Sequence, residues 1–133
     1  MKQKKFDFII CGGGASGLLM LEALREDTFF NGQSILIIEK EIKDVNDRTW
    51  SYWETPNGSF DSMLTKKWSE AKFSSKDQNL DFDLAPFQYK MLRSASFYSN
   101  IRDKYSTSKN TSFLQAEVAI IDSKNTVTEV ITS

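Results

Sequence analysis

Two short apolar runs near the N-terminus enclose a stretch with helical periodicity. FDFIIC at residues 6–11 and SILIIE at residues 34–39 are apolar, rich in strand-forming residues and without strict alternation. Runs of this length and composition are typical of strands buried on both faces of a parallel sheet. Between them, the leucines of LLMLEALRED recur at helical spacing with charged residues opposite, which predicts an amphipathic helix over residues 18–27.

The rest of the chain predicts further strands and one more helix. MLTKKWSEAKFSS and NLDFDLAPFQYKML alternate apolar and polar residues as half-buried strands do, with a turn at Asn57-Gly58 and a break at Pro86. A helix is expected in SASFYSNIRDKYS, with Ser94 as its N-cap. TSFLQAEVAIID and TVTEVIT are expected to be strands joined by a polar turn. The apolar face of the second helix consists of Phe97, Tyr98, Ile101 and Tyr105.

A glycine motif lies where the first strand meets the first helix. Gly12 permits the tight turn, Gly14 lets the backbone approach a pyrophosphate, and Gly17 lets the helix pack closely on the strand. Glu39 follows Gly17 by 22 residues and ends the second strand, where its carboxylate can accept hydrogen bonds from the hydroxyls of an adenosine ribose. This order predicts a βαβ unit that binds a dinucleotide. A glycine turn required only for packing, with an exposed Glu39, is the alternative.

The segment after Glu39 favours FAD over a nicotinamide dinucleotide. A nicotinamide-binding Rossmann domain continues with strand-helix units, whereas KEIKDVNDRTWSYWETPNGSF is polar and aromatic without helical periodicity. The expected fold class is α/β, a Rossmann-like FAD-binding βαβ unit that resembles the glutathione-reductase type, with additional β-strands and a helix. No second flavin loop and no substrate domain are recognisable. Residues 1–133 are therefore expected to be the N-terminal part of an FAD/NAD(P)-binding domain, which is incomplete.

Composition and charge exclude several classes of function. The chain has 133 residues with 17 basic and 18 acidic side chains and no long basic block, so no nucleic-acid partner is expected. No apolar run approaches the roughly 20 residues of a membrane-spanning helix. Because histidine is absent, the chain has no Ser-His-Asp triad, and with one cysteine it has no Cys/His zinc site. No metal is expected.

The single cysteine and the N-terminal segment indicate a reducing compartment. Cys11 allows no internal disulfide, and at the end of a buried strand it is expected to be structural. The start MKQKK is similar to the charged part of a signal peptide, but Asp7 and the glycines interrupt the apolar segment that should follow. We therefore expect a cytoplasmic protein.

Four segments resemble the lycopene cyclase family in order and spacing: DFIICGGGASGLLML, ILIIEKE, NDRTWSYWE and YKMLRSASFYSNI. The DRTW-aromatic-aromatic signature is the most specific, followed by Tyr89, Arg93 and Ser94 leading into FY. The resemblance covers the whole chain and about the first third of the family's usual length. It implies FAD used in the reduced form, NAD(P)H as reductant, and cyclisation of the ψ ends of lycopene to β-ionone rings without net redox change. It also implies a peripheral contact of the complete protein with the cytoplasmic membrane.

The resemblance indicates which residues contact the flavin nucleotide. The backbone N–H groups of Ala15 and Ser16 would face the pyrophosphate, and Arg93 matches an arginine that opens a helix beside the flavin. An ordinary surface arginine is an equal alternative for Arg93, and a solvated lysine is favoured for Lys40. No catalytic residue is assigned, because the family's acidic motifs lie further along. The expected cofactor-binding set is Gly12, Gly14, Ala15, Ser16, Gly17, Glu39, Lys40, Arg48, Thr49, Arg93 and Val118.

Three functions remain open for the chain. The first is the N-terminal portion of a lycopene β-cyclase, an isomerase of the intramolecular lyase type in carotenoid biosynthesis, inactive by itself. The second is another FAD-dependent oxidoreductase, similar to geranylgeranyl reductases or aromatic hydroxylases, and the third is a non-catalytic nucleotide-binding remnant. The NDRTW loop favours the first. Trp50, Tyr52 and Trp53 in that segment could line a carotenoid tunnel or the flavin, although core packing is the favoured role.

Overall fold

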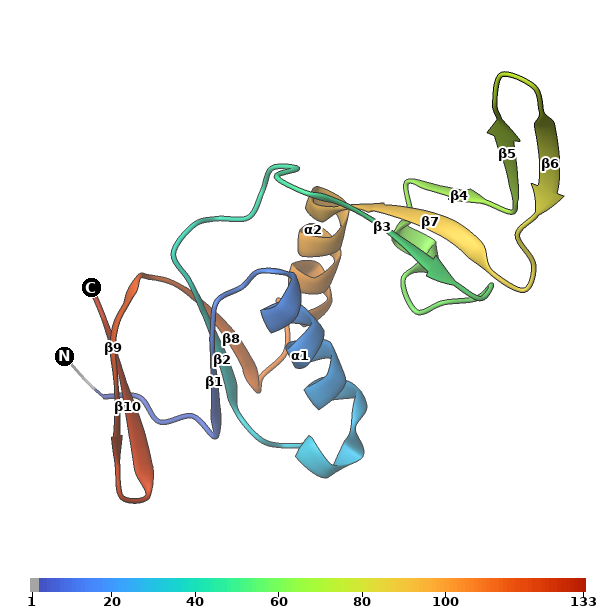
Figure 1. Ribbon diagram of the computed structural model, residues 1–133. Helices are drawn as coiled ribbons and strands as arrows, with labels where there is room; N and C mark the ends of the chain where they lie inside the picture. The colour runs from blue at the N-terminus through green and yellow to red at the C-terminus, as the bar shows by residue number, and fades with distance from the viewer. Residues whose placement is uncertain (1–2) are drawn as a thin grey trace. The chain divides into compact units, whose positions relative to one another are not determined.

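The computed structural model describes residues 3–133, which form two compact units. The first unit comprises Met1–Asp44 and Ile101–Ser133, and the second is Val45–Asn100. The elements, labelled in Figure 1, are β1 (Phe8–Cys11), α1 (Ala15–Glu26), the 3₁₀ turn η1 (Thr28–Phe30), β2 (Ile35–Glu39), β3 (Thr49–Glu54), the 3₁₀ turn η2 (Asp61–Met63), β4 (Lys66–Trp68), β5 (Glu70–Ser74), β6 (Asn79–Asp83), β7 (Gln88–Arg93), α2 (Ser94–Tyr105), β8 (Thr111–Gln115), β9 (Val118–Lys124) and β10 (Val127–Thr132).

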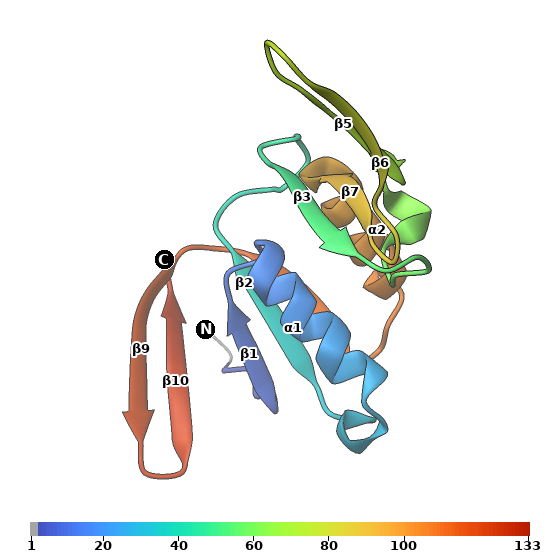
Figure 2. The same ribbon diagram turned by 45° about the vertical axis from the view of Figure 1, so that its right-hand side comes forward.

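The first unit is built on a parallel sheet of strand order β1-β2-β8, with α1 lying along it (Figure 2). The central strand β2 carries the core, and its residues from Ile35 to Ile38 are all buried. Leu18 and Leu21 on α1 are buried as well. Strand, helix and parallel strand follow one another as the sequence predicted, so the α/β fold class with a Rossmann-like βαβ unit is confirmed. After β8 the chain forms an antiparallel hairpin, β9–β10.

One expectation for this sheet is wrong. The sequence predicted that both strands are buried on both faces, but β1 is only half-buried and Cys11 is exposed. The cause is position, because within residues 3–133 β1 pairs with β2 alone and forms an edge of the sheet. The helix also begins earlier than predicted, at Ala15, since small residues after the glycine turn already adopt helical geometry.

The second unit contains an antiparallel sheet of order β3-β7-β4 and a separate β5–β6 hairpin. The sequence did not predict β3, and it predicted one strand where β4 and β5 are two. Trp50 packs edge-on against Phe97 and Tyr98 at the start of α2, with ring centroids 5.7 and 6.0 Å apart. The apolar face predicted for α2 is confirmed, since all four of its residues are buried.

A fully buried lysine connects the elements of the second unit, on the face of the sheet that also carries Trp50. Lys90 Nζ donates hydrogen bonds to Glu54 Oε2 at 2.9 Å, Asp61 Oδ1 at 2.5 Å and the Thr55 carbonyl at 3.0 Å. Burial by itself would lower the pKa of Lys90, but the hydrogen bonds and charges of Asp61 and Glu54 outweigh it and raise that pKa. The hydrogen bond from Lys90 in turn lowers the pKa of Asp61. Lys90 and Asp61 therefore stay charged at neutral pH, and the hydrogen bonds of the cluster tie β3, β7 and η2 to one another.

Membrane crossing was not expected from the sequence. Within residues 3–133, no helix is long and apolar enough to span a bilayer.

Replacing Lys90 tests the weight of this buried cluster. Lys90→Met keeps the aliphatic volume but leaves two carboxylates facing each other, so we expect the free energy of unfolding to fall by about 2 kcal/mol. Lys72→Met is the control, because Lys72 pairs with Asp81 at 3.7 Å on an exposed hairpin, and it should change stability by no more than about 0.5 kcal/mol. Urea unfolding followed by near-UV circular dichroism measures both. Equal losses of stability in the two variants would contradict the stabilising role assigned to Lys90.

Candidate dinucleotide-binding site

The turn after β1 is made possible by Gly12. Its φ of +109° lies in the region that side chains other than glycine rarely adopt. The Gly12 N–H donates to the Ile38 carbonyl at 2.8 Å, so the turn remains attached to β2 while the chain changes direction. The tight turn that the sequence predicted at this glycine is present.

Gly14 and Gly17 face two different surroundings. A Cβ built on Gly17 would lie 2.0 Å from the carbonyl oxygen of Gly12 and 3.2 Å from Ile10 Cγ2, so α1 can approach β1 only with glycine there. A Cβ built on Gly14 meets nothing within 4 Å. The space beside Gly14 is therefore open, as required if a phosphate group is to approach the backbone.

Helix α1 presents its N-terminus at this open space. Its N-cap is Gly14, which makes no side-chain capping bond, and the first turn carries no acidic residue. The N–H groups of Ala15, Ser16 and Gly17 belong to the first turn, which has no carbonyl partners within the helix. These donors, with the positive end of the helix dipole, form the type of anion site that binds phosphates.

Glu39 is hydrogen-bonded directly to the glycine loop. Its Oε2 accepts the Gly13 N–H at 2.7 Å and its Oε1 accepts the Glu41 N–H at 3.1 Å. A Cβ on Gly13 would lie 3.0 Å from Glu39 Cβ, so the Glu39 side chain would have to shift by a few tenths of an ångström to admit any other residue there. Sequence reasoning gave no role to Gly13, although the run of three glycines was a signal for one. Each carboxylate oxygen keeps a lone pair that can accept a hydroxyl proton.

Lys40 and Val118 lie near the end of β2. The Ala116 N–H donates to the Glu39 carbonyl at 3.0 Å, which brings the start of β9 beside that strand end. Lys40 Nζ lies 3.2 Å from Glu117 Oε1, and both side chains are exposed. Lys40, for which the sequence favoured a solvated role over a contact with the cofactor, is exposed. Val118 is the first residue of β9.

The other three predicted residues lie together in the second unit. Thr49 and Arg93 are directly paired between β3 and β7. Arg48 is joined to Ser94 by two backbone-anchored bonds: its carbonyl accepts the Ser94 N–H at 2.9 Å, and its N–H donates to Ser94 Oγ at 3.0 Å. The side chains of Arg48, Thr49 and Arg93 are exposed. The NDRTW loop and the segment of Tyr89, Arg93 and Ser94, which are the two most specific motifs of the sequence, are therefore neighbours in the fold.

Ser94 has a different role from the one predicted. The sequence suggested a helix N-cap, but Ser94 is the first helical residue and its buried hydroxyl bonds backwards, accepting from Arg48 and donating to Asp47 Oδ1 at 2.8 Å. Asn46 Oδ1 accepts the Ala95 N–H at 3.4 Å instead. The serine thus fixes the NDRTW loop to the start of α2.

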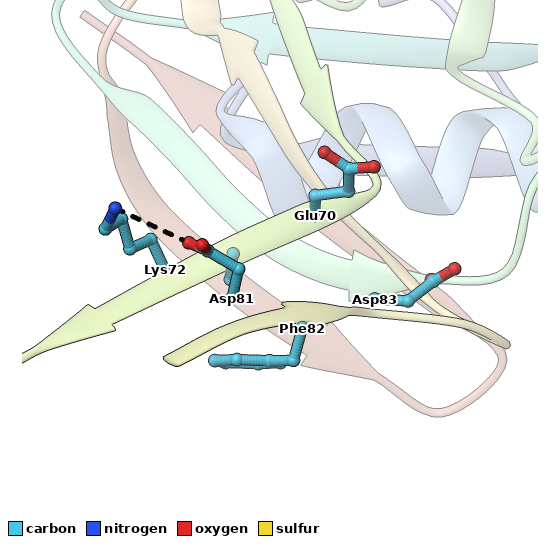
Figure 3. Close-up of a pocket in the computed structure, with 6 residues that line it drawn as sticks. Glu70, Lys72, Asp81, Phe82 and Asp83 are labelled. Atoms are coloured by element: carbon cyan, nitrogen blue, oxygen red, sulfur yellow. Dashed lines mark ion pairs between the residues drawn. The ribbon is translucent and has the colours of Figure 1, made fainter. Parts of the chain in front are cut away.

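A hollow on the β5–β6 hairpin, shown in Figure 3, is separate from these residues. It is lined by Glu70, Ala71, Lys72, Asp81, Phe82 and Asp83. None of the predicted cofactor residues contributes to it, and Lys72 and Asp81 form an exposed ion pair across it. Within the described part of the chain, no group of His, Cys, Asp or Glu has the arrangement of a metal site.

Comparison with solved structures shows the same fold in a monooxygenase, in a hydroxylase and in a protein solved in complex with FAD. The p-nitrophenol 4-monooxygenase PnpA from Pseudomonas putida DLL-E4 aligns with a TM-score of 0.72 at 16% identity, over 100% of this chain and 37% of that one. The 2,6-dihydroxypyridine-3-hydroxylase from Arthrobacter nicotinovorans aligns with a TM-score of 0.63 at 10% identity, over 99% and 34%. CtdE in complex with FAD gives 0.58 at 18%, over 97% and 35%. The chain thus spans about a third of the length of these structures.

Sequence comparison assigns the family. No curated protein matches the chain significantly. The family model described as "Lycopene cyclase protein" matches residues 7–133, which include the glycine loop, Glu39, the NDRTW loop and the β7–α2 junction. The resemblance inferred from the sequence motifs is confirmed, and the chain belongs to the lycopene cyclase family.

Proposed function

We propose that this chain is the FAD-binding N-terminal portion of a lycopene β-cyclase. The observation that carries the proposal is the glycine loop, in which an open position at Gly14, an uncapped helix N-terminus and Glu39 lie around one space. The family match over residues 7–133 supports the cyclase assignment, and the fold shared with CtdE, whose structure contains FAD, supports the cofactor.

The residues of the chain have distinct tasks in this proposal. The N–H groups of Ala15 and Ser16 bind the pyrophosphate, and the carboxylate of Glu39 accepts the two ribose hydroxyls while it holds the loop through Gly13. Thr49 and Arg93, which are paired and exposed, and Arg48 are the residues of the second unit that the family resemblance assigns to the flavin.

Bound FAD, kept reduced by NAD(P)H, would supply an electron-rich partner that stabilises a developing carbocation in a dry cavity. The acid that protonates lycopene lies outside these residues.

A second candidate is an FAD-dependent oxidoreductase that acts on an isoprenoid or aromatic substrate. It is favoured by the structural neighbours, which include a monooxygenase and a hydroxylase. For either candidate we propose a cytoplasmic protein, and for the cyclase a peripheral membrane contact in the complete protein.

Substitutions in the glycine loop separate FAD binding from folding. Gly14→Ala places a methyl group in open space, so the fold should lose no more than about 1 kcal/mol while FAD affinity falls about tenfold or more, because the methyl group faces the pyrophosphate. Gly17→Ala drives a methyl group into the Gly12 carbonyl and should cost about 3 kcal/mol of stability.

The matched control for this pair is Ser16→Ala, which keeps the backbone N–H and should leave FAD affinity nearly unchanged. Thermal unfolding and FAD fluorescence titration give the two readouts. If Gly14→Ala bound FAD as tightly as the unchanged chain, the loop would not be the pyrophosphate site.

Cofactor stoichiometry separates the cyclase from the oxidoreductase. A complete protein that contains this chain, supplied with FAD and NADPH, should form β-carotene from lycopene with NADPH consumption far below one equivalent, because cyclisation is an isomerisation. Product analysis by chromatography and NADPH absorbance measure the two quantities. Stoichiometric NADPH consumption would favour the oxidoreductase. Formation of β-carotene by residues 1–133 alone would contradict their role as only the cofactor-binding part.

A further inference from the structure

Exposed apolar side chains occur at two places in the second unit. On the β3-β7-β4 sheet, Trp53 is 59% exposed beside Tyr89, so core packing, the favoured role for the aromatic residues of that segment, is wrong for Trp53. The same face of that sheet carries the cations Lys66 and Arg93, so it is polar as well as aromatic. The β5–β6 hairpin differs, because one of its faces is formed by apolar side chains alone.

The apolar face of the hairpin consists of four side chains. Residues paired across two strands point to the same face, and the face alternates along each strand. Phe73 pairs with Leu80 and Ala71 pairs with Phe82, so these four residues share one face, which is called the apolar face here. Phe73, Leu80 and Phe82 are 57%, 58% and 43% exposed. Three large apolar side chains are therefore in contact with solvent on one small element.

The opposite face of the hairpin is acidic. Glu70 pairs with Asp83, and Lys72 pairs with Asp81 and forms an exposed ion pair with it at 3.7 Å. Figure 3 shows the ring of Phe82 on the other side of the hairpin from this ion pair. Three carboxylates and one ammonium group are suited to water. The hairpin thus has one face that matches solvent and one that does not.

The strands of the hairpin also have free outer edges. Within residues 3–133, β5 and β6 pair only with each other. An isolated two-stranded hairpin is at best marginally stable in water, and a third strand or a packed face is needed to stabilise it. Free strand edges and exposed apolar patches are both features that proteins normally cover. The described residues therefore leave two kinds of contact open on the same element.

A second copy of the chain and a lipid surface fit these features poorly. A stable dimer buries about 800 Å² on each partner with roughly 20 residues a side, whereas the apolar face has four residues. A lipid surface offers no hydrogen-bonding partners to strand edges in its hydrocarbon region, and anionic headgroups would repel the carboxylates of the acidic face.

A further segment of the same polypeptide fits both open contacts. Its association is intramolecular, so a small interface is sufficient. This chain spans 37%, 34% and 35% of the length of three solved structures that share its fold. A complete protein of similar length would therefore hold most of its residues outside this chain, including strands that could extend the hairpin.

We propose that the β5–β6 hairpin is the docking element for the part of the complete protein that lies outside residues 1–133. That part covers the apolar face and adds a strand to the hairpin. The segment that fits is a strand of alternating apolar and polar residues, because it supplies backbone partners and one apolar side. The inference rests on the proposed function, in which this chain is one portion of a larger protein. It goes further in assigning the junction to residues that have no role in cofactor binding.

Cysteine labelling in two forms of the protein tests the proposal. Phe73→Cys and Lys72→Cys place thiols at neighbouring positions of β5 that point to opposite faces. In residues 1–133 alone, N-ethylmaleimide should modify both thiols at similar rates, because both positions are exposed. In the complete protein, burial should slow labelling of the Phe73→Cys variant about tenfold or more, whereas the Lys72→Cys control should change less than about twofold. Peptide mass spectrometry identifies the labelled residue.

Hydrogen exchange gives a second measurement that needs no substitution. Peptides that cover β5 and β6 should exchange about tenfold or more slowly in the complete protein than in residues 1–133, because the added strand and the covered face protect their amides. The connecting turn, residues 75–78, is the control, since it carries no apolar side chain and should change little.

Three outcomes would overturn the proposal. Equal labelling rates of Phe73→Cys in the two forms, with unchanged hydrogen exchange, would mean that the apolar face stays open. Protection that already develops in residues 1–133 as the protein concentration rises would identify a second copy as the occupant. Protection of the complete protein that requires phosphatidylcholine vesicles would identify a lipid surface.

FAD titration and product analysis of the complete protein keep this inference apart from the proposed function. FAD binding and β-carotene formation with an unprotected hairpin would remove only the docking role. A protected hairpin in a complete protein that binds no FAD would leave the docking role in place and contradict the proposed function.

Discussion

The close approach of backbone to backbone at the glycine loop is the constraint on which the site depends. A Cβ at Gly17 would lie 2.0 Å from the Gly12 carbonyl oxygen, so α1 and β1 can meet only when residue 17 has no side chain. This contact fixes where α1 begins relative to β1. Because the N-terminal donors of α1 point along its axis, the same contact also sets where an anion can bind.

A second close approach completes the loop from the other strand. Gly13 lies against Glu39, and its N–H is held by the carboxylate at 2.7 Å. The end of β2 is therefore connected to the turn after β1 by a charged hydrogen bond, which is stronger than a neutral one. The acid that would recognise a ribose is thus hydrogen-bonded to the loop that would hold the pyrophosphate, so the two parts of the proposed adenosine diphosphate site are directly connected.

Sequence reasoning was most successful where local rules decide the structure. The order of strand, glycine turn, helix and acid is encoded within one continuous segment, so Gly12, Gly14 and Gly17 could each be matched with a geometric need. Sequence reasoning was wrong where residues distant in the sequence decide burial and strand pairing. Cys11 is exposed because β1 is an edge strand, and no local pattern reports an edge. Lys90 is fully buried because Glu54 and Asp61, which lie 36 and 29 positions earlier in the chain, are its hydrogen-bond partners. In the same way, β3 forms only because β7 pairs with it.

The central claim is that the Glu39 carboxylate binds a ribose while it holds the glycine loop. The most direct measurement compares the affinities of ADP and 2′,3′-dideoxy-ADP for the unchanged chain and for Glu39→Gln. The unchanged chain should prefer ADP by about tenfold or more, as expected for hydrogen bonds to a charged group, and Glu39→Gln should lose most of that preference. The same preference in both proteins would contradict the account, because the ribose hydroxyls would then be recognised elsewhere.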